Sequence, residues 1–330
     1  MHPLAELEIS VSSREAVRVV GASVPSGAEG IGAPRKNYLQ KHGYAWGLLV
    51  PMLIFFIVFN AIPLLWMIGL SFYRYVLTSG EAPVSVGLEN YHQLLTDQAM
   101  WGSFSRTLIF VLLTVLGASL LGGLLGFLFW GSAKMPGRRL ALTLLFTPML
   151  LTPVAVGAFY RLMLDPNFGV ISYLFGLVTG GREDLLSKPA TAFPTVLLID
   201  IWMWTPFMTL ITLAALASVP TAELEAAKVD RLRWVTVLRR VILPHAKFIL
   251  MLGVLLRTID AFKTTDLVLL LTSGGPGSST EFLGIRLYRL GFDSLNMGMA
   301  STVAVIALFV AIGFTTLYLY VLNLKKQEDA

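Results

Sequence analysis

The stretch LIFVLLTVLGASLLGGLLGFLF, residues 108–129, contains no charged residue. A helix of about 20 apolar residues spans the hydrocarbon core of a bilayer, whereas a membrane β-barrel needs strands of roughly 10 residues with alternating polarity. Several windows of the chain meet the helical requirement, and none shows the alternation. The sequence therefore predicts an all-α membrane protein with six transmembrane helices, at about residues 45–72, 104–130, 140–163, 193–217, 246–271 and 298–322.

The composition supports a membrane protein and gives no sign of catalysis. Hydrophobic residues make up 55% of the 330 residues and charged residues 14%, against about 25% charged residues in soluble domains. The chain has no cysteine, which excludes disulfides, iron–sulfur clusters and thiol chemistry. Its four histidines are scattered, without an HExxH motif or the spacing of a metal site. We expect no catalytic residue and no metal, and hence a chain that is not an enzyme on its own.

The basic residues indicate how the chain is oriented. With a cytoplasmic N-terminus, six spans leave four segments inside, and sixteen of the 25 Lys and Arg residues fall in these segments and their flanks. Seven fall in the outer segments and two within the spans. This bias is the positive-inside rule, so the basic balance reflects topology and not nucleic-acid binding. We expect an inner-membrane protein with both termini cytoplasmic, a largely disordered cytoplasmic tail over 1–43 and a transmembrane domain over 44–325.

Small residues and prolines mark two of the spans. Gly117, Ala118, Gly122, Gly123 and Gly126 lie within the second span, where small side chains let neighbouring helices approach closely. The third span contains Pro148 and Pro153, and prolines within a span permit bending. These patterns predict tight packing of the second span and a bend in the third.

Residues 219–244 form the one strongly charged inner segment between two spans. It contains EAAKVDRLRWVTVLRRVILP, residues 225–244. Each charged residue would cost ~2.5–3.5 kcal/mol at the centre of a membrane helix, so the segment lies outside the hydrocarbon. Pro220 and Thr221 are typical of a helix start, and Pro244 suits the first turn of the next helix. The segment is predicted to be a helical hairpin on the inner surface, or simply a solvated connector.

The pattern resembles the EAA loop of ABC importer permeases. The matching residues are Glu225, Ala226, Ala227, Asp230 and, at the family's distance, the Leu-Pro pair ending at Pro244. Arg231 departs from the family, which usually has glycine there, and a glycine permits a sharp bend. Further segments look like carbohydrate-uptake permeases of the maltose or glycerol-phosphate type: GLENYHQLLTD (87–97), LDPNFGVIS (164–172), WTPF (204–207) and LTSGGPGSSTEFLGIRLYRLGF (271–292).

The resemblance implies a type I ABC importer permease with six transmembrane helices and a cytoplasmic coupling helix. The chain has no GxxxxGK[ST] phosphate loop, so ATP and Mg²⁺ would bind at partner subunits and no cofactor at this chain. The implied partners are a second homologous permease in a heterodimer, two cytoplasmic ATPase subunits, a soluble extracytoplasmic solute-binding protein and membrane lipid. The residues expected to contact the ATPase are Glu225, Ala226, Ala227, Asp230, Arg231, Leu232 and Pro244.

Charged residues within the spans are candidates for the cargo path, because ionisable groups in a membrane helix rarely face lipid. Arg257, Asp260, Lys263 and Asp266 recur at every third position of the fifth span. They form either a self-neutralising ladder of ion pairs, pairs with the partner permease, or the lining of the cavity, which would include Thr264. In the fourth span, Asp200, Trp202 and Trp204 suit the hydroxyls and faces of a sugar, and interface anchoring is the alternative for the tryptophans.

The remaining alternatives concern the class of transporter and the cargo. A secondary carrier built from six-helix halves would leave the EAA segment unexplained, and a membrane enzyme or a scaffold has no supporting motif. Glu281 and Arg286 in the last outer loop are candidates for contact with the binding protein. Arg257 and Lys263 leave room for an anionic sugar unless the adjacent aspartates already neutralise them, and the family handles mono- and oligosaccharides, polyols and glycerol phosphates.

Overall fold

The computed structural model describes residues 38–131, 136–181 and 183–328. By its contacts the chain divides into two compact units, Met1–Val58 and Phe59–Ala330. In the first unit the described part is α1 (Tyr38–Phe56) and the start of a π-helical turn, Ile57–Ala61, which continues into the second unit. The helix begins within the tail predicted over 1–43, and the rest of that tail, residues 1–37, lies outside the described residues.

The described part of the second unit is mostly helical and contains a small hairpin, β1 (Tyr73–Arg74) with β2 (Val84–Ser85), in which Tyr73 pairs with Ser85. Its α-helices in chain order are α2 (Ile62–Leu70), α3 (Glu89–Thr96), α4 (Gln98–Gly131), α5 (Arg138–Phe146), α6 (Pro153–Met163), α7 (Val170–Thr179), α8 (Pro189–Ala217), α9 (Thr221–Val229), α10 (Trp234–Val237), α11 (Leu243–Phe262), α12 (Asp266–Leu271), α13 (Leu283–Tyr288) and α14 (Met297–Glu328).

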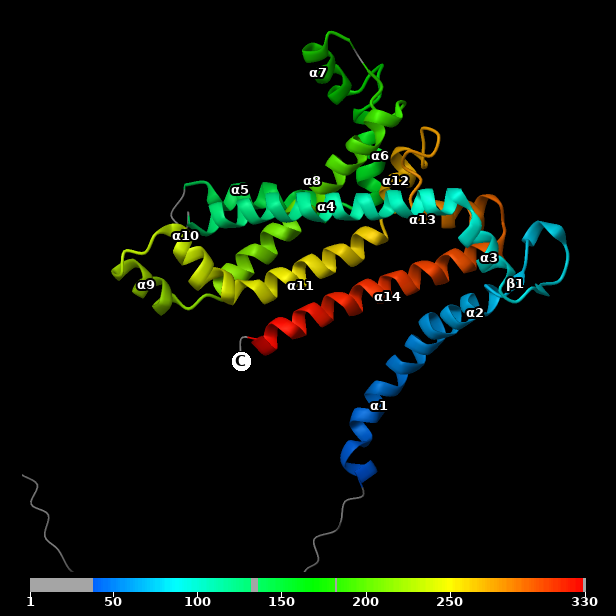
Figure 1. The fold of residues 1–330 in the computed structure, drawn as a ribbon, viewed down its shortest axis with the longest axis horizontal. Helices are drawn as coiled ribbons and strands as arrows, with labels where there is room; N and C mark the ends of the chain where they lie inside the picture. The colour runs from blue at the N-terminus through cyan, green and yellow to red at the C-terminus, as the bar shows by residue number, and fades with distance from the viewer. Residues whose placement is uncertain (1–37, 132–135, 182, 329–330) are drawn as a thin grey trace, which may run out of the picture. The chain divides into compact units, whose positions relative to one another are not determined.

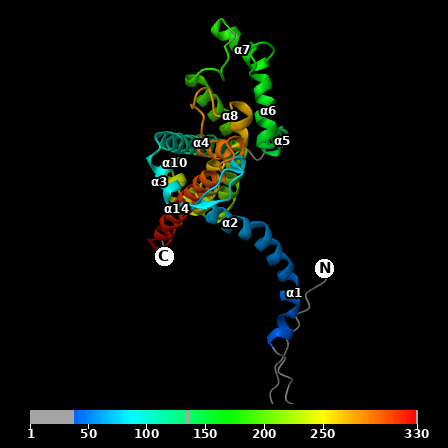
Figure 2. The same ribbon diagram turned by 90° about the vertical axis from the view of Figure 1, so that its right-hand side faces the viewer.

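Five stretches of helix have the length and apolar character needed to cross a membrane, namely Gly47–Leu70, Gln98–Gly131, Pro189–Ala217, Trp234–Phe262 and Met297–Tyr320. A sixth crossing is obtained if Arg138–Leu150 and Pro153–Met163 are taken together, although they are bent by 99°. The predicted all-α membrane fold is confirmed, with the third span in two pieces. Figure 2 shows α6 leading away from α5 toward α7.

The bend in the third span lies where the prolines predicted it. Thr152 precedes Pro153 and is extended, with φ −72° and ψ 148°, as the residue before a proline prefers. Its hydroxyl accepts a hydrogen bond from the backbone N–H of Ala155 at 3.3 Å, which caps the start of α6. One helix therefore ends and a new one begins within the predicted span.

The fifth span differs from the prediction at both ends. The helix starts at Trp234 and runs through a π-helical turn, Leu238–Ile242, into α11. The second half of the predicted surface hairpin is thus the beginning of the span, with Pro244 in the first turn of α11. At the other end α11 stops at Phe262, and α12 begins only at Asp266. The ladder predicted along one continuous helix is therefore interrupted.

Close packing of α4 against α8 forms the centre of the unit (Figure 1). A Cβ atom at Gly122 would lie 2.5 Å from Cβ of Met208, and one at Gly126 would lie 2.6 Å from Cβ of Thr212. Gly123, in contrast, faces open space. The predicted role of the small residues in helix approach is confirmed for Gly122 and Gly126, and α11 packs on this pair.

The two ends of the α4–α8–α11 bundle carry different elements. α9 and α10 lie at one end, and α3, β1 and α13 lie at the opposite end (Figure 1). Near the first end, Leu216, Val219, Ile242 and Ala246 form a buried cluster against which Leu224 of α9 packs. At the second end, Leu94, Met100, Leu283 and Val303 form another. The helices thus hold the charged segment of α9 and α10 and a set of loops at opposite ends.

Candidate functional site

A buried ionic group joins three helices in the middle of the bundle. The guanidinium group of Arg257 on α11 forms an ion pair with Asp200 on α8, and both side chains are fully buried. Thr114 on α4 donates its hydroxyl hydrogen to Asp200 and accepts a hydrogen bond from Arg257 Nη2 at 2.9 Å. Arg257 Nη1 donates to Asp260 at 3.0 Å. The group is held in place by hydrogen bonds to both charges.

This pairing shows how two of the four charged positions of the fifth span, Arg257 and Asp260, are arranged within the chain. Arg257 pairs within the chain, with Asp200 on another helix and with Asp260 one turn away. Among the described residues the ladder of pairs three positions apart does not extend beyond Arg257 and Asp260, because the helix ends before Lys263. Asp200, predicted to meet a sugar, is engaged by Arg257 through one carboxylate oxygen.

Trp204 lies one turn after Asp200 on α8 and contacts the same guanidinium group. The guanidinium carbon of Arg257 lies 4.9 Å from the centre of the Trp204 ring, a distance typical of a cation–π contact. The ring also meets Phe207 edge to face at 6.0 Å. The tryptophan is thereby fixed against the ion pair and is half-buried.

A cavity of about 160 Å³ opens where α11 ends. The non-helical residues Lys263, Thr264 and Thr265 form one wall, and α8 and the start of α6 form the others. The full set of lining residues is Pro153, Asp200, Met203, Trp204, Asp260, Lys263, Thr264, Thr265, Asp266 and Leu267. The break in the fifth span is therefore what lets charged and hydroxyl side chains converge at this depth.

Of the seven residues predicted for the cargo path, six line this cavity: Asp200, Trp204, Asp260, Lys263, Thr264 and Asp266. Trp202 does not. It is 41% exposed, and its ring lies 5.4 Å from that of Tyr160. Residues two positions apart point to nearly opposite sides of a helix, so Trp202 and Trp204 face different surroundings. Thr114 was missed by sequence reasoning, since a single threonine in an apolar helix gives no signal of an ionic partner.

The predicted coupling residues lie on and after α9, but not all on one side. Glu225, Ala226 and Asp230 are exposed, together with Val229, which is 81% exposed. Ala227 is 4% exposed and packs inward, and its predicted contact with a partner ATPase stays a prediction. Leu232 is 41% exposed, and Pro244 is exposed at the start of α11.

Arg231 adopts a left-handed backbone conformation, which agrees with the glycine expected at this position from the resemblance. Its φ is 52°, in the left-handed region that favours glycine. The backbone N–H of Leu232 donates to the carbonyl of Ala227 at 3.0 Å, the bond that closes a helix end of the Schellman type. The sharp turn after α9 is therefore formed in this chain with an arginine at the turn.

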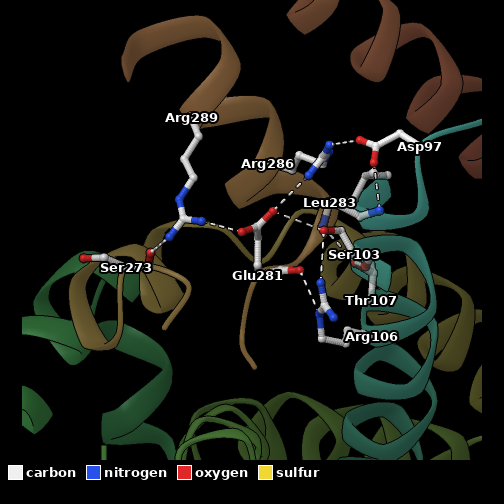
Figure 3. Close-up of polar contacts among 10 residues, drawn as sticks. Asp97, Ser103, Arg106, Thr107, Ser273, Glu281, Leu283, Arg286 and Arg289 are labelled. Carbon is white, nitrogen blue, oxygen red and sulfur yellow. Dashed lines mark hydrogen bonds and ion pairs between the residues drawn. The ribbon is translucent and has the colours of Figure 1, made fainter. Parts of the chain in front are cut away.

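Glu281 and Arg286, in the loop predicted to be outside, are joined to each other and are largely buried. Glu281 accepts from Arg286 Nη1 and from Ser103, each at 3.3 Å, and also pairs with Arg289. Arg286 pairs in addition with Asp97, at the end of α3 (Figure 3). Glu281 is 8% exposed. The network ties α3, α4 and α13 together, and the expectation that Glu281 reaches a soluble partner is not supported.

The family model and the similar proteins found by comparison all describe components of membrane transport systems. Residues 118–327 match the family model described as "Binding-protein-dependent transport system inner membrane component". The trehalose/maltose transport system permease protein of Thermococcus litoralis is 29% identical, covering 85% of this chain and 93% of that protein. The sulfoquinovosyl glycerol transport system permease protein of Agrobacterium fabrum is 29% identical over 84% of this chain and 90% of its own length.

The fold has a counterpart among solved structures. A chain of a bacterial ABC transporter involved in the import of the acidic polysaccharide alginate superposes with a TM-score of 0.74. The superposition covers 86% of this chain and 96% of that chain, at 20% sequence identity. At this identity the likeness concerns the fold, and it agrees with the arrangement of helices described above.

Proposed function

This chain belongs to the family of binding-protein-dependent transport system inner membrane components, and from this premise we propose the parts that its residues play in carbohydrate import. It is a membrane-spanning permease subunit of an ATP-driven importer, and the cargo passes beside the cavity formed by α8 and the broken fifth span. The observation that carries this proposal is the convergence of Asp200, Trp204, Asp260 and Lys263 on one cavity.

The size of the cavity supports a second permease subunit as a partner. Complete ligand pockets have volumes of roughly 300–1,000 Å³, and the cavity in this chain holds about 160 Å³. A homologous permease facing it would complete the path, and the heterodimer would be served by two cytoplasmic ATPase subunits and a soluble extracytoplasmic binding protein. ATP and Mg²⁺ bind at the ATPase subunits and no cofactor binds at this chain.

The end of the bundle that carries α9 is assigned to the cytoplasm. α9 and its flanks contain basic residues typical of inner loops, and Glu225, Ala226, Val229 and Asp230 present an exposed surface. This surface docks on an ATPase subunit and passes its movement to α8 and α11, which α9 joins. Both chain termini are then cytoplasmic, and α3, β1 and α13 face the solute-binding protein.

The proposal is tested on membrane vesicles containing the complete transporter, purified through a tag on this chain. We expect an ATPase and a second permease to co-purify, and sugar uptake to require ATP together with the soluble binding protein. Uptake that proceeds without ATP and follows an ion gradient would identify a secondary carrier instead. Reporter fusions at positions 85, 180 and 285 should be outside, and at 135 and 235 inside.

A further inference from the structure

The charges in the wall of the cavity at the end of α11 do not suit an anion. Asp200, Asp260 and Asp266 contribute three carboxylates and Lys263 one ammonium group, a formal sum of −2. The guanidinium group of Arg257 behind the wall brings this sum to −1. An acidic sugar entering the cavity would therefore add a negative charge to a site whose formal charge is already negative.

The arginine that could have received an anion is already occupied. Arg257 has no exposed side-chain surface, and it pairs with both Asp200 and Asp260. Its aromatic contact with Trp204 further fixes the guanidinium group at 4.9 Å from the ring centre. The remaining cation, Lys263, lies within electrostatic range of Asp260. Arg257 is therefore not available to a carboxylate or sulfonate without displacing a carboxylate of the chain, and Lys263 is outnumbered by the three carboxylates of the wall.

The same wall offers hydrogen-bond acceptors to a donor. Asp200 Oδ1 is buried and has no hydrogen-bond partner among the described residues, although the side chain lines the cavity. Ionised carboxylates are acceptors only, and a buried acceptor without a partner costs free energy. Hydroxyl or ammonium groups of a cargo would satisfy Asp200, Asp260 and Asp266, and the half-buried Trp204 provides an apolar ring beside them.

We propose that the cargo is an uncharged or amino-substituted sugar and that the cavity rejects uronates and sulfonated sugars. The inference rests on the proposed function, since it takes the cavity as part of the cargo path. The family does not decide the matter, because the names of the two similar permeases include both a neutral disaccharide and a sulfonated glycoside. The acceptors and the neutralised arginine of this chain decide it.

The test separates sugars by charge and does not require the cargo to be identified first. Radiolabelled polysaccharide hydrolysate is split by ion exchange into neutral, cationic and anionic fractions, each supplied to cells with the chain, without it, and with it restored. We expect uptake from the neutral or the cationic fraction to fall by about tenfold without the chain and to return on restoration. Uptake from the anionic fraction should stay unchanged, because like charges brought close together oppose binding by roughly 100-fold or more.

The outcomes for the two proposals are distinguishable. If the anionic fraction alone depends on the chain, the chain is a sugar permease and the proposed cargo class is wrong. If no fraction depends on it, the proposed function is wrong as well. A second measurement uses the cargo found: Asp266→Asn should raise the KM of uptake several-fold at unchanged amounts of complex, and Asp293→Asn, exposed and outside the cavity, should not. An unchanged KM for Asp266→Asn would also contradict the assignment.

Discussion

The buried carboxylate of Asp200 on α8 is paired with the buried guanidinium group of Arg257 on α11, 57 positions later in the chain. The pair is a polar link between two of the helices that contribute residues to the cavity. Removing one partner of a buried ion pair leaves the other charge without compensation, which costs ~3–5 kcal/mol. The stability of the bundle should therefore depend on having both residues or neither.

We expect Asp200→Asn and Arg257→Met each to lower the unfolding temperature of the purified complex strongly. The double variant Asp200→Asn/Arg257→Met should recover part of the loss, because no buried charge is left unpaired. Lys188→Met is the matched control: it breaks the exposed pair of Lys188 with Glu183, and exposed pairs contribute ~1 kcal/mol or less. A double variant less stable than both single variants would contradict this account.

The close approach of α4 to α8 makes a second prediction. Gly122→Val would place side-chain atoms against the backbone of Met208, where even a Cβ would come within 2.8 Å of the carbonyl carbon. Overpacking of this kind costs typically ~1–3 kcal/mol. Gly123→Val, on the next position of the same helix, meets nothing within 4 Å and should leave the unfolding temperature nearly unchanged. Equal effects of the two substitutions would show that α4 and α8 do not pack as described.

Part of this architecture could be predicted from residues alone. Pro148 and Pro153 marked the bend in the third span, and the glycines of α4 marked its contact with α8. The reason is local, since a proline ring and a missing side chain act on the backbone or on the nearest helix. The signals predicted where the chain bends and where it packs, without identifying the partner residue of any charge.

The break of the fifth span and the ion pair could not be predicted in this way. Lys263, Thr264 and Thr265 include neither proline nor glycine, so the break contains neither of the residues that most often end a helix. The helix stops there because Leu267 and Leu271 of α12 are buried in a separate core beside α6, and Gly157 of α6 allows α12 to approach. Tertiary packing overrides local preference here, and the pairing of Asp200 with Arg257 depends on the resulting arrangement.

The left-handed turn at Arg231 makes a third prediction. A residue other than glycine in this conformation is strained by roughly 1–2 kcal/mol. Glycine removes this strain, but it also gives the unfolded chain more freedom, and this reduces the gain in stability. We expect Arg231→Gly to be slightly more stable than Arg231→Ala, by about 1 kcal/mol, and both to retain stimulated ATP hydrolysis. If hydrolysis falls in both variants, the guanidinium group itself contacts the ATPase.

The exposed side of α9 makes the last prediction, which concerns coupling. Glu225 lies on the surface with Ala226 and Val229, whereas Glu223 on the same helix bonds to His245 within the chain at 3.0 Å. If Glu225 pairs with a basic group of an ATPase subunit, replacing it buries an unpaired charge at the interface, at a cost of ~2–5 kcal/mol. Glu225→Lys should therefore weaken docking by orders of magnitude and abolish ATP hydrolysis stimulated by the binding protein.

Glu223→Gln keeps a hydrogen-bonding group beside His245 and should preserve hydrolysis, so it controls for damage to α9. The readout is stimulated hydrolysis by the reconstituted complex, together with the amount of ATPase that co-purifies. Full stimulation in the Glu225→Lys complex would leave α9 as a solvated connector between α8 and α11.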